Sequence, residues 1–260
     1  MRDFVKKHLK TLLFFTLVGL FGGFFTGIYL LESYPEEIKN QLINEIKATM
    51  PFEIDINILM GIITAVQSAF YGLVLGGIGI ILAKKVGLWK DERKIESKPL
   101  LVTVVASIVF GLAMILPDIF FFGRFSDAIL NSYATKPTVS YILACVTYGA
   151  VIEEVMLRLF TLSLVAFILH FIFERSRGEV SEKILICANI VCALLFAVGH
   201  LPGTFIILGS SPMIIFRCIL LNGAGGLIFG YLYRKYGLRY AMIAHGGCHI
   251  VSKLIWILFL

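Results

Sequence analysis

Long runs of apolar residues recur along the chain, separated by short polar segments. Each run is about as long as the roughly 20 residues that a helix needs to cross the hydrocarbon core of a bilayer. None of the runs shows the strict alternation of a β-barrel strand, and backbone groups in lipid must find their partners within the membrane-spanning structure itself. The pattern therefore predicts transmembrane helices. They lie at residues 11–31, 56–83, 99–116, 139–173, 184–208, 212–233 and 239–259.

The run at 139–173 is longer than a single straight span requires. It can tilt, extend beyond the bilayer or break into two helices, so the pattern predicts seven or eight spans. No repeat, low-complexity tract or flexible linker divides the chain. We therefore expect an all-α, polytopic helical membrane bundle that forms a single transmembrane domain over residues 1–260.

Composition and charge agree with a membrane protein and suggest its orientation. Only 15% of the residues are charged, against about 25% in soluble proteins. Lys and Arg concentrate in alternate polar segments, and such segments remain on the cytoplasmic side. We therefore expect a multi-pass protein of the cell membrane with its N-terminus in the cytoplasm and its C-terminus outside. The net charge of +6 follows from this loop bias and indicates no nucleic-acid partner. The basic segments are residues 1–10, 84–98, 174–183 and 234–239.

Two further features have simple structural interpretations. Segment 35–50 has apolar residues at the spacing of a short amphipathic helix, which we place at the outer membrane surface. The five cysteines all fall inside the spans and include no CxxC pair. They are expected to be small buried apolar residues and neither a disulfide framework nor a zinc knuckle. They are Cys145, Cys187, Cys192, Cys218 and Cys248.

Ionisable residues inside the spans are few, and each is a candidate functional group because charge in lipid is costly. The last four spans hold all of them. They are Glu153, Glu154, Arg158 and His170 in the fourth span, His200 in the fifth, Arg217 in the sixth, and His245, His249 and Lys253 in the seventh.

The spacing of these residues predicts specific pairs. Glu154 and Arg158 are four residues apart, so they lie one helical turn from each other and can form an ion pair. Glu153 lies about 100° further round the helix and stays free for another task. His245 and His249 share a helix face at a spacing that is common for metal-binding histidines.

Three short motifs that contain these residues match the pattern of a known protein family. The segment EEVMLR at 153–158 resembles the EExxxR motif of the CAAX-prenyl-endopeptidase-like intramembrane proteases, also called the CPBP family of CAAX proteases and bacteriocin-processing enzymes. Phe196 and His200 match its second motif, FxxxH. His245 begins the third motif, HxxxN or HxxxD, but His249 stands where the family has Asn or Asp. The motifs occur in the family's order within residues 139–250.

This resemblance implies an intramembrane endopeptidase that hydrolyses peptide bonds with a Glu- and His-activated water. It implies that Glu153 is the general base. We expect His200 to hold the water or share its proton, and His245 and His249 to direct N–H groups at the oxyanion. Glu154 would complete the catalytic group by orienting Glu153.

Arg158 and Phe196 are expected to support this group. A metal site is an alternative, because His200, His245 and His249 could hold zinc with an open fourth position. The sequence leaves metal-free and zinc-dependent hydrolysis open.

The expected substrate is a peptide or protein C-terminal segment reached from the bilayer or the cytoplasm, and the resemblance implies a prenylated CAAX tail as one form of it. Membrane lipid is the other expected partner, and the sequence does not give the oligomeric state. Two other functions fit the same residues. One is a non-catalytic bacteriocin-immunity or scaffold protein in which the polar cluster fixes helix packing. The other is an ion or proton transporter. His170, Arg217 and Lys253 are assigned to structure.

The depth of the histidines leaves one difficulty. Counting about 1.5 Å per residue places Glu153 and His245 in the inner half of the membrane. His200 would lie nearer the outer half, unless the fifth helix begins well inside the cytoplasm or a predicted span end is wrong.

Overall fold

The computed structural model describes residues 2–49, 54–90 and 95–260, and these ranges contain helices and no strand. Seven helical segments are long and apolar enough to cross a membrane, which confirms the predicted all-α bundle. The elements are α1 (Arg2–Ser33), α2 (Glu36–Thr49), α3 (Ile56–Phe70), η1 (Tyr71–Leu75), α4 (Gly76–Lys85), α5 (Ser97–Phe120), η2 (Phe122–Arg124), α6 (Asp127–Asn131), α7 (Val139–Ala144), η3 (Cys145–Glu153), η4 (Val155–Leu162), α8 (Ser163–Phe173), α9 (Glu182–Gly199), α10 (Leu201–Leu208), α11 (Pro212–Tyr236) and α12 (Leu238–Phe259).

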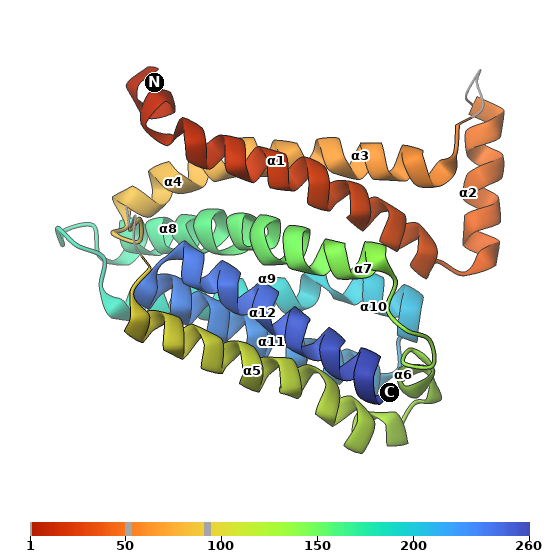
Figure 1. Ribbon diagram of the computed structural model, residues 1–260. Coiled ribbons are helices and arrows are strands. Elements are labelled where there is room, and N and C mark those ends of the chain that lie inside the picture. The colour runs from red at the N-terminus through yellow and green to blue at the C-terminus, as the bar shows by residue number, and fades with distance from the viewer. Residues whose placement is uncertain (1, 50–53, 91–94) are drawn as a thin grey trace.

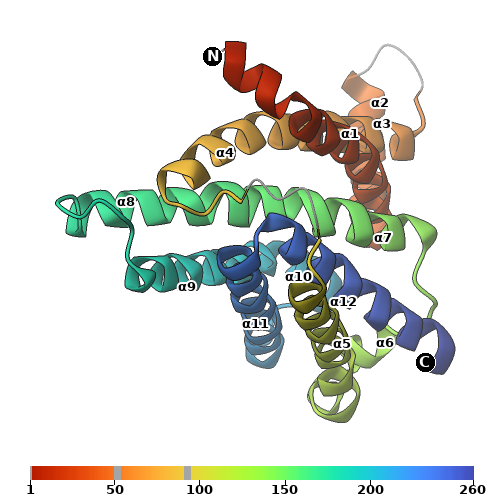
Figure 2. The ribbon, with the colours of Figure 1, turned by 60° about the vertical axis from the view of Figure 1, so that its left-hand side comes forward.

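The fourth span is one continuous rod. It runs through α7, η3, η4 and α8 from Val139 to Phe173 without a break, so the chain has seven spans and not eight. In Figures 1 and 2 this rod lies between a group formed by α1, α3 and α4 and a group formed by α5, α9, α11 and α12. The segment η3 packs against both α1 and α12, which places it at the centre of the bundle.

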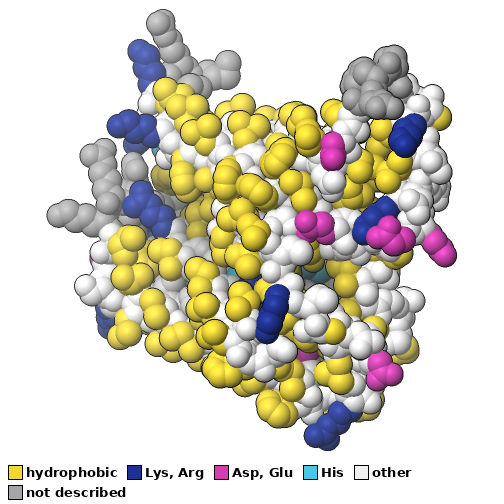
Figure 3. Space-filling view, turned by 45° about the vertical axis from the view of Figure 1, so that its right-hand side comes forward, with side chains coloured by type: hydrophobic (Ala, Val, Ile, Leu, Met, Phe, Trp, Pro, Cys, Tyr) yellow, Lys and Arg dark blue, Asp and Glu magenta, His cyan; other side chains and the backbone are white. Residues whose placement is uncertain are grey.

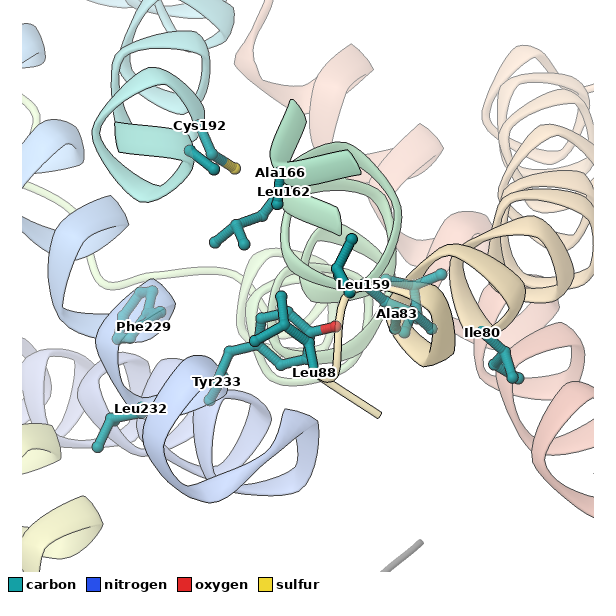
Figure 4. Close-up of a cluster of buried hydrophobic side chains, with 14 of the residues drawn as sticks. Ile80, Ala83, Leu88, Leu159, Leu162, Ala166, Cys192, Phe229, Leu232 and Tyr233 are labelled. Atoms are coloured by element: carbon teal, nitrogen blue, oxygen red, sulfur yellow. The ribbon is translucent and has the colours of Figure 1, made fainter. Parts of the chain in front are cut away.

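The hydrophobic core surrounds this central rod. Figure 4 shows Leu159 and Leu162 on the rod, with Ala83 from α4 on one side and Phe229 and Tyr233 from α11 on the other. All five of these side chains are almost completely buried. The core therefore holds the fourth span against helices from both groups and fixes the direction in which its polar residues point.

Small residues let the first two spans approach closely. Gly19, Gly23 and Gly27 recur every four residues on α1, a spacing that is typical of tight helix packing in membranes. A Cβ atom at Gly23 would lie only 2.5 Å from the carbonyl oxygen of Thr64, and one at Gly27 would overlap the carbonyl of Met60. Any larger side chain at these positions would push α3 away from α1.

Polar residues define where several spans begin. Asp55, Thr138, Ser181 and Ser211 each precede a helix and accept a hydrogen bond from a backbone N–H of its first turn. Such N-caps satisfy donors that the helix itself leaves unpaired. Gly237 makes the short turn between α11 and α12 with a φ of 112°, a conformation that favours glycine.

The polar segments are sorted between the two ends of the bundle. In Figure 1 the N-terminus, the α4–α5 connection, the α8–α9 hairpin and the α11–α12 turn lie at one end, and α2, α6 and the C-terminus lie at the other. The basic segments thus share an end, as the alternation predicted. Hydrophobic side chains dominate the face shown in Figure 3. The structure fits a multi-pass membrane protein; that the basic end is cytoplasmic remains a prediction.

Two smaller expectations can also be compared with the structure. Residues 36–49 of the predicted amphipathic segment form α2, which has no buried residue and runs across the end of the bundle; residues 50–53 lie outside the described ranges. All five cysteines are free thiols. Four of them are buried as expected, but Cys187 is exposed on α9, because it lies on the outward face of that helix.

Candidate active site

The acidic motif lies where the fourth span changes its winding. The π-helices η3 and η4 end and begin on either side of Glu154. A π-helix places more residues in each turn than an α-helix, and it is frequent at functional sites. The angle between Glu153 and Glu154 is therefore smaller than the ~100° that an α-helix would give. The two glutamates lie in different surroundings.

Glu154 lies at the centre of a buried charged cluster. Its Oε1 atom is 3.0 Å from Nη1 of Arg158, and both side chains are fully buried, so the predicted ion pair is present. The same oxygen is 2.8 Å from Nδ1 of His245 on α12, which is 3% exposed. Glu154 thus contacts the first histidine of the third motif directly.

Aromatic rings enclose this cluster. The guanidinium of Arg158 lies 4.7 Å from the ring centroid of Phe196 and 5.4 Å from that of Phe229. The ring of His245 stacks on Phe229 with centroids 4.6 Å apart. Cation–π contacts partly replace the hydration that a buried guanidinium loses. Phe196, the first residue of the second motif, therefore acts here as a packing partner for both the arginine and the histidine.

Glu153 faces a different environment. Its side chain is 22% exposed, against 0% for Glu154. Its Oε2 atom is 3.9 Å from Nε2 of His245, too far for a direct hydrogen bond and suitable for a bridging water. Figure 3 shows small areas of histidine in the recess between the surrounding helices. Glu153 is thus the more accessible of the two carboxylates.

A glycine leaves space beside these groups. A Cβ atom at Gly149, four residues before Glu153, would lie 3.7 Å from Nε2 of His249 and 3.8 Å from Nε2 of His245. Both imidazole nitrogens therefore point at the space above Gly149. The same space adjoins Glu153 through its 3.9 Å approach to His245. We did not expect a role for Gly149 from the sequence, although its position one turn before Glu153 is the signal that could have indicated one.

The two remaining histidines lie at the edge of this space. The rings of His245 and His249 stack with centroids 5.1 Å apart, and Nδ1 of His249 is buried without a hydrogen-bond partner among the described residues. His200 lies at the junction of α9 and α10, where its Nδ1 is 2.8 Å from the carbonyl oxygen of Phe196. His200 also interacts electrostatically with His249. The site thus draws residues from the fourth, fifth and seventh spans.

The position of the α8–α9 hairpin resolves the depth difficulty. In both ribbon views the hairpin at 174–181 extends further out than the α11–α12 turn at the same end of the bundle. Helix α9 therefore begins further toward that end of the bundle than α12 does. This offset agrees with the position of His200 next to Phe196, whose ring centroid lies 4.5 Å from that of His200 and 5.9 Å from that of His245.

Two of the three residues assigned to structure, His170 and Arg217, lie beside an acidic side chain. His170 lies 3.9 Å from Glu174 at the end of α8. Arg217 forms a bidentate contact with Asp118, in which its Nε donates to Oδ1 at 2.5 Å. The sequence did not suggest Asp118 because we placed the end of the third span at residue 116, whereas α5 continues to Phe120. The sequence signal for this pair would have been an acidic and a basic residue, Asp118 and Arg217, near the ends of neighbouring spans.

The three histidines have the donor chemistry of a zinc site, so their arrangement was compared with one. Nδ1 of His245 contacts Glu154 and Nδ1 of His200 contacts a backbone carbonyl, which are contacts that metal-binding histidines commonly make and which leave Nε2 as the candidate ligand atom. No three His, Cys, Asp or Glu side chains in the described ranges are grouped closely enough to hold a metal ion. The side chains as they stand do not fit a three-ligand centre, and we derive no step through a metal.

Comparison with known proteins agrees with the motifs. Residues 134–251 match the family model described as type II CAAX prenyl endopeptidase Rce1-like, a little under half of the chain. The matched range contains all three motifs, which confirms the resemblance noted in the sequence. No curated protein and no solved structure matches the chain.

Proposed function

We propose that this chain, whose residues 134–251 belong to the Rce1-like CAAX prenyl endopeptidase family, is an intramembrane endopeptidase in which Glu153 activates the attacking water. The family supports CAAX-type protease activity in general, with peptide or protein substrates and membrane lipid as partners. The roles of individual residues and the substrate are our proposal. We expect the substrate to be a C-terminal segment, prenylated or unmodified, that reaches the site from the membrane.

A single observation carries this proposal. The partly exposed carboxylate of Glu153 lies 3.9 Å from Nε2 of His245, a separation that one water beside them can bridge, and Nε2 of His249 lies near the same glycine, Gly149. A general base must reach the proton that it removes either directly or through one water. A packing residue would have no need of an accessible carboxylate opposite two imidazole nitrogens.

Hydrogen bonding suggests different tasks for the two histidines of α12. Glu154 is paired with Arg158 and is therefore a carboxylate, which can only accept a hydrogen bond, so Nδ1 of His245 carries the proton. In the neutral imidazole Nε2 is then an acceptor, suited to holding the water. His249 has no partner at Nδ1, so its proton can reside on Nε2 and be donated to a substrate oxygen.

The reaction can be written with these groups alone. Glu153 takes one proton from the water while the water oxygen attacks the substrate carbonyl carbon. The electron pair of the carbonyl double bond then moves to the carbonyl oxygen. The N–H of His249 stabilises that oxyanion. When the intermediate collapses, the C–N bond breaks and the leaving amine nitrogen takes the proton from Glu153. We assign to His200 a supporting role at the edge of this group, because the ring of Phe196 contacts the rings of both His200 and His245.

Glu154 and Arg158 have a positioning role in this scheme. We expected Glu154 to orient Glu153, but its contacts are with Arg158 and His245. Its negative charge fixes the tautomer and the ring orientation of His245. The buried arginine in turn places a positive charge 3.0 Å from the Glu154 carboxylate.

A Glu153→Gln variant tests the proposal. The probe is a library of fluorescence-quenched peptides in two matched sets, with farnesylated or unmodified cysteine, added to protein in phosphatidylcholine–phosphatidylglycerol vesicles. We expect the wild type to cleave members of the library and the variant to lose about 10²–10⁴-fold in rate. Circular dichroism and size-exclusion chromatography of the variant check its fold. Cleavage at the wild-type rate by the folded variant would contradict the assigned base.

The zinc alternative has its own measurement. Metal content of the purified wild type and of His249→Asn, determined beside cleavage, separates the two routes. Cleavage without bound metal supports the glutamate route. Stoichiometric zinc that is lost in the variant together with activity would contradict it.

A further inference from the structure

Lys253 is a buried cation that the proposed reaction does not use. It lies on α12, one turn beyond His249, and is 5% exposed. Its Nζ atom donates a hydrogen bond to the hydroxyl of Tyr141 at 3.1 Å and lies 4.2 Å from the centroid of that ring. The ring of Trp256 is 5.7 Å away. The aromatic surroundings stabilise positive charge but supply no negative charge.

The absence of an acidic partner distinguishes Lys253 from the other buried cations. Arg158 has Glu154, and Arg217 has Asp118. No carboxylate in the described ranges lies within 4.0 Å of Nζ of Lys253, and all its interactions are with neutral groups or at longer range. A buried cation without a counter-charge is costly and marks a candidate binding site for an anion.

Lys253 adjoins the candidate active site. It interacts electrostatically with His249, and Cys145 on η3 interacts electrostatically with both Lys253 and Glu153. The segments η3 and α12 pack against each other along this length. Tyr141 and Trp256 are only half-buried, so the lysine lies just behind the surface of the bundle.

The spacing along α12 suits an extended peptide. Four residues of α-helix separate His249 from Lys253, a rise of about 6 Å. An extended chain advances about 3.3 Å per residue. An anion held by Lys253 would thus lie about two residues from a carbonyl group held by His249. The one anion that every peptide main chain carries is its C-terminal carboxylate, which necessarily lies on the leaving-group side.

We propose that Lys253 is a specificity-determining residue that binds the C-terminal carboxylate of the peptide substrate, with the Tyr141 hydroxyl as a second donor. This inference rests on the proposed function and adds to it the residue that recognises the C-terminus of the substrate. The substrate carboxylate completes the ion pair that the free protein lacks.

The test compares three peptides that differ only at the C-terminal end. The first has a free carboxylate, the second a C-terminal amide, and the third an amide with an acidic side chain at the last residue. We expect the wild type to prefer the first over the second by about tenfold to a hundredfold in kcat/KM. Lys253→Met should cleave the amide as the wild type does and lose the preference, while Lys253→Arg should retain part of it. Lys136→Met, at an exposed lysine near the same end of α12, is the matched control and should keep the full preference.

Failure of this inference differs from failure of the proposed function. Equal cleavage of carboxylate and amide by the wild type, or an unchanged preference in Lys253→Met, overturns the inference alone. Recovery of full activity by the third peptide assigns Lys253 to an acidic side chain and overturns the C-terminal assignment. If no peptide is cleaved, the proposed function fails. Binding of the same peptides to Glu153→Gln then makes the comparison without cleavage, and equal affinities overturn the inference.

Discussion

The described part of the bundle contains two pairs in which a fully buried carboxylate contacts a guanidinium. They differ in how many of their polar atoms have hydrogen-bond partners. Asp118 of α5 uses both oxygens, accepting from Arg217 of α11 and from the hydroxyl of Tyr133. Glu154 directs one oxygen at both Arg158 and His245. Its other oxygen has no hydrogen-bond partner in the described ranges, and neither has Nε of Arg158.

The surroundings of the two pairs differ in the same sense. The Asp118 pair joins α5, α11 and the segment before α7 near one end of the bundle, where its third member is the hydroxyl of Tyr133. The Glu154 pair lies next to the partly exposed carboxylate of Glu153 and to imidazole nitrogens that lie near Gly149. Buried polar atoms are nearly always paired in proteins, and exceptions concentrate where function requires them. We therefore assign the first pair to packing and the second to the proposed site.

Neutralising each acid tests most directly whether the two pairs differ in role. We expect Glu154→Gln to lower the cleavage rate by about 10³–10⁴-fold, as is typical when a carboxylate that fixes a histidine tautomer is lost. Asp118→Asn should leave the rate per folded molecule within a few-fold. Both changes remove one partner of a buried pair and should lower the free energy of unfolding by about 3–5 kcal/mol. Cleavage assays on folded fractions, with thermal unfolding in parallel, separate the two effects. An equal loss of rate in both variants would show that the pairs do not differ in role.

The second prediction concerns His249. Replacement by Ala removes the proposed oxyanion donor and should lower kcat by about 10²–10³-fold. Replacement by Asn restores an N–H donor and the residue found in the family pattern, so most of the activity should remain. A large loss in His249→Asn with an intact fold would show that the imidazole does something an amide cannot do.

Gly149 gives a smaller and more selective effect. The Cβ atom of Gly149→Ala would meet the two imidazole nitrogens at ordinary contact distances, so the fold should tolerate it. It would occupy the space assigned to the water, and displacement by about 1 Å can cost 10²-fold in rate. The matched control is Gly178→Ala, a glycine of the α8–α9 hairpin with open space around it. Wild-type kinetics in Gly149→Ala would place the water elsewhere.

The smallest effect is a pH dependence outside the membrane. In the α8–α9 hairpin the Ser181 hydroxyl donates to Glu174 and, with the Ser181 backbone N–H and Arg177, holds the pKa of that carboxyl below its ordinary value. The hydrogen bonds therefore stabilise the hairpin fully above the ordinary pKa of about 4.3, and the contribution is lost as the pH falls through the lowered one. The protection factors of the amides in 174–181, which compare the measured exchange rates with the intrinsic rate at each pH, should fall below about pH 4. Glu174→Gln should remove this dependence, and protection factors that stay constant in the wild type across that range would contradict it.

The fold and the family motifs could be predicted from the sequence because they depend on local rules. The length of the apolar runs indicated all seven spans, and the four-residue spacing indicated the pair of Glu154 and Arg158. A single continuous rod at 139–173 was within the alternatives but could not be chosen, because tilt and protrusion depend on neighbouring helices.

The rest of the site depends on how helices are offset and wound. The contact of Glu154 with His245 joins residues 91 positions apart. The π winding at η3 and η4 and the protrusion of the α8–α9 hairpin both result from tertiary packing and have no sequence pattern that we recognised. Asp118 was missed because we ended the third predicted span at residue 116, four residues before the end of α5.

The most direct measurement is an experimental structure of the Glu153→Gln protein with an uncleaved peptide bound. The account predicts the scissile carbonyl carbon in the recess above Gly149, its oxygen within hydrogen-bond reach of His249, and a water within about 2.6–3.2 Å of residue 153. A peptide bound away from this recess, or residue 153 turned toward lipid, would contradict it.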